Sequence, residues 1–366
     1  MTIAPRTDPP QEATPVRRFT APLALTMGDA AGIGPECIIK AWQAAALERV
    51  VVVGDVQVMR RAARQVGGVQ PIVACIDDPS DLSQVPVGCL CVLEPSGLPL
   101  GLAELPMGRV DARCGAAAAL CIESAVAWVG RGACAGIVTA PIHKEALSAA
   151  GIGYPGHTEM LQALAAGPQG LPPVRMMLAN DELRVVLVTI HLSLRKAIDA
   201  VTFDAVLETL RIAHRSSALW GQPAPRIAVA GLNPHAGEGG LFGDEEIRII
   251  GPAIEAARAE GVNASGPFAP DTVFMRARHA AGHAGKFDLV VAMTHDHGLI
   301  PVKYLGVEQG VNVTLGLPFV RTSPDHGTAF DIAGTGRADP SSLLSALRVA
   351  RQAAEDIGRL ESRVDP

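Results

Sequence analysis

The chain has 366 residues, of which 48% are hydrophobic and 19% charged, so it is long enough to bury a substantial core in one large or two medium domains. Its formal net charge of -6 offers no basic stripe that would neutralise a phosphate backbone, which argues against a nucleic-acid partner. The seven cysteines have no paired spacing and indicate a reducing compartment rather than a disulfide framework.

The first predicted segment is a disordered tail at residues 1–22, which is rich in proline and charge and has no apolar stretch like that of a signal peptide. After it, polar or charged residues interrupt every apolar run before it reaches the ~20 residues that span a bilayer. These features predict a cytoplasmic protein that does not contact a membrane.

Short runs rich in β-branched residues then alternate with alanine-rich segments. The predicted strands are residues 23–27, 50–53, 136–139, 185–189, 226–230 and 289–293, and the predicted helices are residues 115–129, 203–218 and 244–260. Nearly continuous apolar runs of this length are typical of strands that are covered on both faces. The pattern therefore predicts an α/β protein.

A histidine follows each of the last three predicted strands. His191 comes just after the first of these, His235 after the second and His295 after the third. A lone histidine in such a loop is more often a local hydrogen-bonding residue than a ligand, but ligands of open α/β sheets bind at the carboxyl ends of the strands. Three imidazoles also suit a divalent metal ion and leave positions open for a substrate. We therefore predict one catalytic metal site.

A glycine-rich loop follows the first predicted strand and precedes an apolar helix. It runs from Gly28 to Glu36 and carries Gly32 and Gly34. Its spacing differs from the G-x-G-x-x-G dinucleotide fingerprint, and a tight strand-to-helix turn explains the glycines equally well. Gly32 and Gly34 are therefore candidate cofactor contacts, with a simple turn as the alternative.

A second polar loop follows Arg321. Gly327 and Thr328 supply backbone freedom and a hydroxyl group, and Asp331 supplies a carboxylate. Such a loop could wrap an adenosine, with Asp331 accepting hydrogen bonds from ribose hydroxyls, or it could be a polar connection. The residues alone favour neither alternative.

Several motifs together resemble the PdxA family of 4-hydroxythreonine-4-phosphate dehydrogenases, from about residue 22 to about residue 360. They are Thr26-Met-Gly-Asp-Ala-Ala-Gly-Ile-Gly-Pro-Glu36, Thr139-Ala-Pro-Ile-His-Lys-Glu-Ala-Leu147, Tyr154-Pro-Gly-His-Thr-Glu159, Leu232-Asn-Pro-His-Ala-Gly-Glu238, His295-Asp-His-Gly298 and residues 310–333. The resemblance implies a two-lobed isocitrate/isopropylmalate-dehydrogenase-like fold with the active site in the interlobe cleft. Lobe I, on the cofactor side, would comprise residues 23–138 and 306–362, and lobe II, on the metal and dimer side, residues 139–305.

The resemblance also implies roles for individual residues. It assigns the divalent metal ion (Zn, Mn, Mg or Co) to His191, His235 and His295, at the interface of a homodimer, and the substrate with its phosphate to His157, Thr158, Lys303, Asn312 and Arg321. Lysine and arginine suit this task because they give charge-assisted hydrogen bonds to anions. The base that removes the hydroxyl proton stays open among Lys303, Asp271 and Asp296.

The implied reaction is the oxidation, by NAD or NADP, and decarboxylation of a 4-phosphorylated four-carbon hydroxy acid. The alternative within the family is 4-phospho-D-threonate or 4-phospho-D-erythronate as substrate. The alternatives from other classes are a metal-dependent hydrolase or isomerase and a small-molecule binding protein. His143, Thr294, His297 and Ala30 stand where the family usually has Asn, Tyr, Gln and Pro, which bears on the identity of the substrate rather than on the reaction class.

Overall fold

The computed structural model describes residues 21–168, 170–218 and 222–364, so most of the predicted tail lies outside the described residues. These residues form one twelve-stranded sheet in the order β3-β4-β2-β1-β5-β12-β11-β6-β7-β10-β8-β9. The strands are β1 (Leu23–Thr26), β2 (Val50–Val53), β3 (Val73–Ile76), β4 (Leu90–Leu93), β5 (Gly136–Thr139), β6 (Arg175–Ala179), β7 (Arg184–Leu187), β8 (Ile227–Ala230), β9 (Ala264–Phe268), β10 (Leu289–Ala292), β11 (Val311–Leu315) and β12 (Val320–Pro324). All six strands predicted from the apolar runs are present, so the α/β prediction is confirmed.

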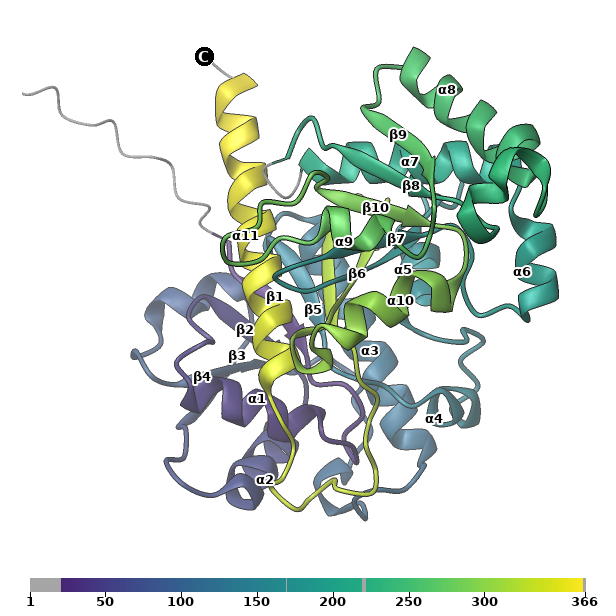
Figure 1. Ribbon diagram of the computed structural model, residues 1–366. Coiled ribbons are helices and arrows are strands. Elements are labelled where there is room, and N and C mark those ends of the chain that lie inside the picture. The colour runs from purple at the N-terminus through teal and green to yellow at the C-terminus, as the bar shows by residue number, and fades with distance from the viewer. Residues whose placement is uncertain (1–20, 169, 219–221, 365–366) are drawn as a thin grey trace, which may run out of the picture.

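Helices cover both faces of this sheet (Figure 1). They are α1 (Gly34–Gln43), α2 (Val56–Val66), α3 (Ala112–Gly130), α4 (Lys144–Ala149), α5 (His157–Leu164), α6 (Leu194–Ala200), α7 (Phe203–Ser217), α8 (Gly251–Ala259), α9 (Val273–Ala277), α10 (His295–Tyr304) and α11 (Ser341–Val364). The helix predicted over residues 244–260 is divided into a π-helical turn at Glu246–Ile250 and α8. Pro252 explains the division, because it lies in the first turn of α8 and has no amide hydrogen to continue an earlier helix.

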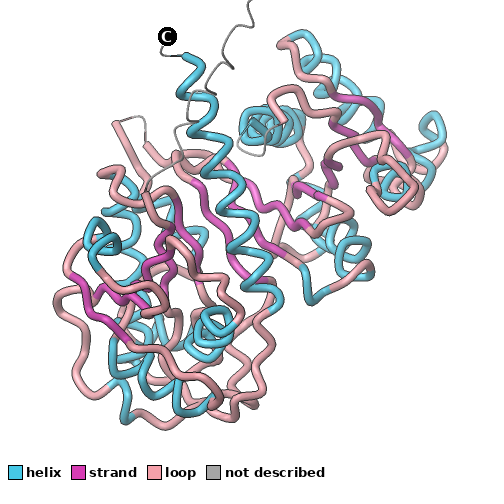
Figure 2. Tube along the Cα trace, turned by 90° about the vertical axis from the view of Figure 1, so that its left-hand side faces the viewer, coloured by secondary structure: helices cyan, strands magenta, loops and turns pink. Residues whose placement is uncertain are grey.

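The two ends of the sheet are parallel, but its centre is not. Strands β3, β4, β2, β1, β5 and β12 all run in one direction, and β11, β6 and β7 are each antiparallel to the strand before them in this order. Strands β7, β10, β8 and β9 are parallel to one another and therefore antiparallel to the first set. A sheet twists by about 20–25° per strand, so the second parallel set is rotated well away from the first. In Figure 2 the strands, in magenta, extend from one end of the molecule to the other.

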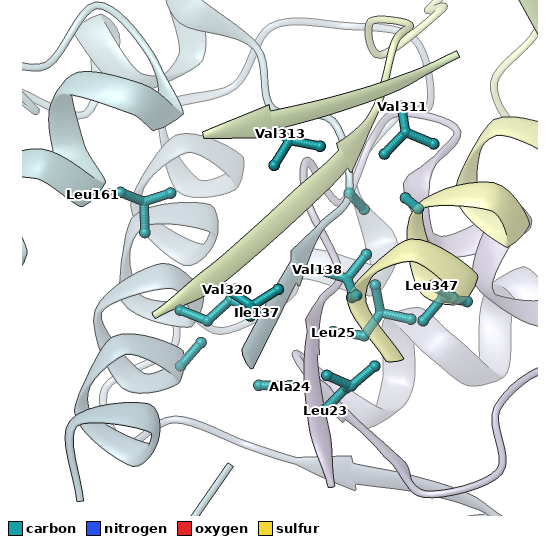
Figure 3. Close-up of a cluster of buried hydrophobic side chains, with 14 of the residues drawn as sticks. Leu23, Ala24, Leu25, Ile137, Val138, Leu161, Val311, Val313, Val320 and Leu347 are labelled. Atoms are coloured by element: carbon teal, nitrogen blue, oxygen red, sulfur yellow. The ribbon is translucent and has the colours of Figure 1, made fainter. Parts of the chain in front are cut away.

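One hydrophobic core is continuous along the sheet. Around β1, β5, β12 and β11 it contains Leu25, Val138, Val313 and Val320, with Leu347 of α11 and Leu161 of α5 packed against them (Figure 3). In β8 and β10, alternate side chains divide between this core and a smaller cluster that includes Leu299 and Val302 of α10. The core therefore joins both parts of the sheet, and the boundaries of lobes I and II stay a prediction.

Helix α3, of 19 residues, is apolar enough by length and composition to cross a membrane, with a mean hydropathy of 1.3 in an 18-residue window. The sequence reasoning did not foresee a run of this kind. In the structure α3 lies against α4 so closely that a Cβ on Gly115 would be 2.0 Å from the Ala146 carbonyl oxygen. Such contact is typical of a core helix, and it requires glycine at this position.

Candidate active site

A cavity of about 640 Å³, which we call the main cavity because it contains most of the predicted substrate-binding residues, opens where the ends of β5, β12 and β7 meet the beginning of α5. Of the predicted site residues, it is lined by His157, Thr158, His191, Asn312, Arg321 and Gly327. These come from five separate segments of the chain, so only the tertiary structure brings them together. The cavity is also lined by Lys144, Glu159, Asp325 and His326, which sequence reasoning did not select although they lie within the motifs Thr139–Leu147, Tyr154–Glu159 and 310–333.

Arg321 is a buried cation without an acidic partner. Its side chain lies on β12 and the residue is only 3% exposed. Its terminal nitrogens donate to Thr139 Oγ1 at 2.7 Å and Thr314 Oγ1 at 3.0 Å, while its Nε has no partner. Burial lowers the pKa of this guanidinium to about 10, and among the described residues no carboxylate forms an ion pair with it. A buried positive charge of this kind is suited to an anionic ligand.

His157 begins helix α5 beside Arg321. Burial first, and then the charge of Arg321, lower the pKa of this imidazole well below 6.5, so the ring is neutral. It hydrogen-bonds to the Ala140 backbone, while its Nε2 is buried without a partner among the described residues. The N-cap residue Gly156 supplies no side-chain cap, so the first amides of α5 are open to an anion.

Lys303 is connected to the cavity by an ion pair with a carboxylate in the cavity wall. It lies near the end of α10, and its Nζ is 2.7 Å from Oδ2 of Asp325, which lines the cavity. Asp325 is fixed in turn, because its amide donates to Ser342 Oγ at 3.0 Å. Of the other two candidate bases, Asp271 is exposed in the turn before α9 and is not among the residues that line this cavity.

His191 and His295 lie together at the ends of β7 and β10. Their ring centroids are 5.6 Å apart, and both line a hollow of about 270 Å³ that shares His191 with the main cavity. Burial, followed by the charges of Lys144 and His295, lowers the pKa of His191, which favours the neutral form that binds metals. Asp296 Oδ1 is 2.8 Å from His295 Nδ1, so the third candidate base orients this ring and leaves Nε2 open.

His235 does not complete a metal site with these two rings. It is exposed in the turn Pro234–Gly240, where residues 235–239 all have left-handed backbone angles. In residues 21–168, 170–218 and 222–364, no three histidine, cysteine, aspartate or glutamate side chains meet in a group able to hold a metal ion. One chain therefore assembles His191 and His295, and the position of His235 relative to them must be explained separately.

The turn that carries His235 is held by a buried carboxylate. Glu246 is 4% exposed and accepts hydrogen bonds from the amides of Leu232 and Asn233 at 2.7 and 2.8 Å. It also accepts one from Asn233 Nδ2 at 3.0 Å, while Glu245 accepts a second from the same amide group at 2.6 Å. Glycine is required beside it, since a Cβ on Gly237 would be 2.9 Å from Glu246 Oε2.

The two candidate cofactor loops form one unit. The Ile33 amide donates to the Thr328 carbonyl oxygen at 3.0 Å, and a Cβ on Gly32 would be 3.0 Å from the Thr328 side chain. Gly34 is also tightly packed, because a Cβ there would be 2.5 Å from the Met27 carbonyl oxygen. Asp331 is exposed. The glycines thus have a packing role, and a cofactor contact remains a prediction.

His143, one of the departures from the family pattern, contacts the second of these loops. Its ring stacks on Phe330 with centroids 4.6 Å apart and an interplanar angle of 8°. It precedes α4, whose first residue Lys144 lines the main cavity. His143 therefore connects the wall of the cavity to the loop that carries Gly327 and Thr328.

Comparison with known proteins places these features in a family. The family model described as "Pyridoxal phosphate biosynthetic protein PdxA" matches residues 46–350. A 4-hydroxythreonine-4-phosphate dehydrogenase of Beijerinckia indica is 56% identical over 333 residues, covering 90% of this chain and 94% of that protein. A D-threonate 4-phosphate dehydrogenase of Pectobacterium atrosepticum is 46% identical over 336 residues, covering 91% and 99%.

A solved structure has the same fold. The crystal structure of a 4-hydroxythreonine-4-phosphate dehydrogenase from Klebsiella pneumoniae is 45% identical and superposes with a TM-score of 0.82, covering 93% of this chain and 99% of the other. The likeness extends over both parallel parts of the sheet, because it includes nearly the whole chain.

Proposed function

Because this chain belongs to the PdxA family, we propose that it oxidises a hydroxyl group of a 4-phosphorylated four-carbon hydroxy acid with NAD or NADP, and that decarboxylation follows. That it is an oxidoreductase follows from its similarity, over about nine-tenths of its length, to proteins named as dehydrogenases. The observation that supports the substrate class most directly is the buried, unpaired Arg321 in the wall of a cavity that also contains His191.

The phosphate of the substrate would lie against Arg321. The open amides at the beginning of α5 and the side chain of Thr158 face the same cavity. Together they provide a positive charge and neutral donors, which is the combination that phosphate groups bind. The neutral His157 offers a free Nε2 that can accept a hydrogen bond from a hydroxyl group.

The reacting hydroxyl would lie at the other end of the cavity, near His191. His191 and His295 would hold the divalent ion, and the neutral state of His191 and the free Nε2 of His295 fit that role. When bound, the ion would polarise the hydroxyl group and the nicotinamide would accept the hydride. Of the three candidate bases, Lys303 is best placed, because Asp325 holds its ammonium group beside the cavity.

The order of the two chemical changes follows from the substrate. Oxidation at C3 of such an acid places a carbonyl group β to the carboxylate, and acids of this kind lose CO₂ when the charge left behind is stabilised. We propose 4-hydroxythreonine 4-phosphate as the substrate, with 4-phospho-D-threonate or 4-phospho-D-erythronate as the alternative. We retain that alternative because the chain is similar to a D-threonate 4-phosphate dehydrogenase.

We further propose a homodimer with the metal site at the subunit interface. Large apolar side chains are exposed on the segments that follow β7, β8, β9 and β10, where the three histidines also lie: Leu192, Leu194, Ile198, Leu241, Phe242, Ile247, Met275 and Ile300. Exposed apolar surface of this extent is typical of protein interfaces. A second copy can then supply the His235 that one chain does not bring to His191 and His295.

The seven free cysteines support a cytoplasmic location, since disulfides are rare there.

The test is an assay of the purified protein with Mn²⁺ or Zn²⁺, NAD⁺ or NADP⁺, and each of the three phosphorylated acids. We expect reduced cofactor and CO₂ to form in equal amounts with one of them, and Arg321→Met to raise KM on the order of 100-fold, because it removes a charged pair of hydrogen bonds to the phosphate. Turnover that requires the metal but no nicotinamide would instead support the hydrolase or isomerase alternative.

A further inference from the structure

Two threonine hydroxyls take the place that a carboxylate usually occupies beside a buried arginine. Arg321 lies on β12, between β5 and β11. Its nitrogens contact Thr139 of β5 at 2.7 Å and Thr314 of β11 at 3.0 Å, and both threonines are almost completely buried. Arg321 thus donates one hydrogen bond to each of its two neighbouring strands.

The strand register explains why these three side chains meet. Arg321 is paired with Ile137 in β5, so Thr139, two residues further on, faces the same side of the sheet. Val313 is paired with Thr322, so Thr314 lies beside Arg321 on the other neighbouring strand. Thr322 itself points to the opposite face, where its Oγ1 donates to the Ala346 carbonyl oxygen of α11 at 2.9 Å.

Hydroxyl partners have a different consequence from a carboxylate partner. A carboxylate would satisfy the guanidinium and also cancel its charge, which is the usual arrangement for buried arginine. A hydroxyl oxygen accepts a hydrogen bond but carries no charge. Arg321 donates to one threonine from each terminal nitrogen, which fixes the plane of the guanidinium, while Nε has no partner and the positive charge stays uncompensated.

We propose that Thr139 and Thr314 are positioning residues that hold Arg321 with its charge uncompensated, so that the guanidinium binds the phosphate group of the substrate. The proposal rests on the proposed function for the identity of the ligand. It goes further in assigning the affinity for phosphate to two uncharged side chains that flank the arginine on its two neighbouring strands. The protein without ligand keeps a destabilising charge, and a bound phosphate removes that cost.

Binding of inorganic phosphate, measured by titration calorimetry on the full chain, tests the proposal without any need for turnover. Thr139→Val and Thr314→Val keep the shape of each side chain and remove its hydroxyl. We expect each to weaken phosphate binding on the order of 10-fold, and Thr139→Ser and Thr314→Ser to restore it, since a hydrogen bond to a charged group is lost or kept. In the enzyme assay KM should rise for both valine variants while kcat changes little.

Thr322→Val is the matched control, because it removes a buried hydroxyl from the same sheet at the position next to Arg321 but on the other face. It should leave phosphate affinity within about 2-fold of the wild type, although it also loses a hydrogen bond. If Thr322→Val and Thr139→Val weaken phosphate binding equally, or if neither valine variant at 139 or 314 weakens it, the proposal is wrong.

Thr314→Asp tests the role of charge directly and does not depend on the valine variants folding well. The substitution gives Arg321 a carboxylate partner, so it should raise the melting temperature of the protein and abolish phosphate binding. If Thr314 had only a structural role, these two quantities would not change in opposite directions. Loss of phosphate binding in the threonine variants of a protein that reduces no nicotinamide would support this inference while contradicting the proposed function. Normal phosphate binding in the threonine variants of a protein that is an active dehydrogenase would contradict this inference and support the proposed function.

Discussion

At the scale of single residues, the candidate site contains backbone angles and protonation states that are energetically unfavourable. His191 has a positive φ angle of 47°, in a region in which a residue with a side chain is disfavoured by on the order of 1 kcal/mol. Arg321 is a buried cation and His157 a buried neutral imidazole. Strain and perturbed pKa values that gather in one cavity are typical of a functional site.

His157 should make the stability of the protein depend on pH. In the unfolded chain this imidazole takes up a proton near pH 6.5, whereas in the folded chain its pKa lies well below that value. The unfolded state therefore binds more protons between the two values, and the free energy of unfolding should fall as the pH falls below 6.5, by at most about 1.4 kcal/mol per pH unit from this group.

His157→Gln should lessen this dependence, because glutamine does not titrate. The measurement is urea unfolding of both proteins at several pH values between neutrality and mild acid. We expect the free energy of unfolding to fall less steeply with acid in the variant. Parallel curves would show that His157 takes up its proton equally in both states.

At the scale of elements, the turn Pro234–Gly240 shows how the fold fixes a loop with unfavourable backbone angles. Its residues 235–239 are left-handed throughout, which no local propensity favours outside glycine. The three hydrogen bonds that Glu246 accepts hold the entrance to this turn from the π-helical segment Glu246–Ile250. Because the predicted helix at residues 244–260 is divided, the carboxylate of Glu246 lies in the π-helical segment, where it accepts these hydrogen bonds.

Glu246→Gln should loosen the turn. The amide keeps the shape of the side chain but has one acceptor oxygen in place of two, and its NH₂ group would face donors. We expect a loss of about 1–3 kcal/mol in the free energy of unfolding and weaker binding of the proposed metal ion, measured by thermal unfolding and by titration with a chelator.

Glu245→Gln is the comparison for this change, since among the described residues Glu245 accepts a single side-chain hydrogen bond, from Asn233 Nδ2. Its effect on both quantities should be clearly smaller. Equal effects would mean that the loss of negative charge near the turn, rather than the hydrogen bonds of Glu246, is responsible.

At the scale of the whole molecule, the cavity exists because the sheet changes direction at its centre. The reversals at β11, β6 and β7, together with the twist, bring the ends of β7 and β12 to one space although the two parallel sets run in opposite directions. His191 and His295 come from one side of this arrangement, and His235 does not join them in one chain. The proposed dimer would place a partner's turn at this point.

Complementation between inactive chains tests the shared site. A heterodimer of His191→Ala with His235→Ala would keep one intact site of two, and should recover about half of the wild-type activity. The matched control pairs His191→Ala with His295→Ala, whose rings lie 5.6 Å apart in the same chain, so both sites stay broken and the heterodimer should be inactive. Inactivity of the first heterodimer would show that the histidines act within a single chain.

The sequence by itself determined the class of fold and six of the twelve strands that the structure describes. Runs such as Val50–Val53 and Gly136–Thr139 match the strands residue for residue, because an apolar segment of this length is stable only when both of its faces are covered. The strands β11 and β12 were not predicted, since polar residues punctuate them. Three of those polar residues, Asn312, Arg321 and Ser323, line the cavity.

Only the tertiary structure decided which candidates meet. The sequence placed three histidines after three strands, but the distance between loops depends on strand order and twist, which no local pattern contains. For the same reason it could not show that Asp325 holds Lys303, that Asp271 lies away from the cavity, or that Thr139 and Thr314 flank Arg321. These contacts join residues far apart in the chain, and the burial that gives Arg321 its chemistry exists only once the sheet has formed.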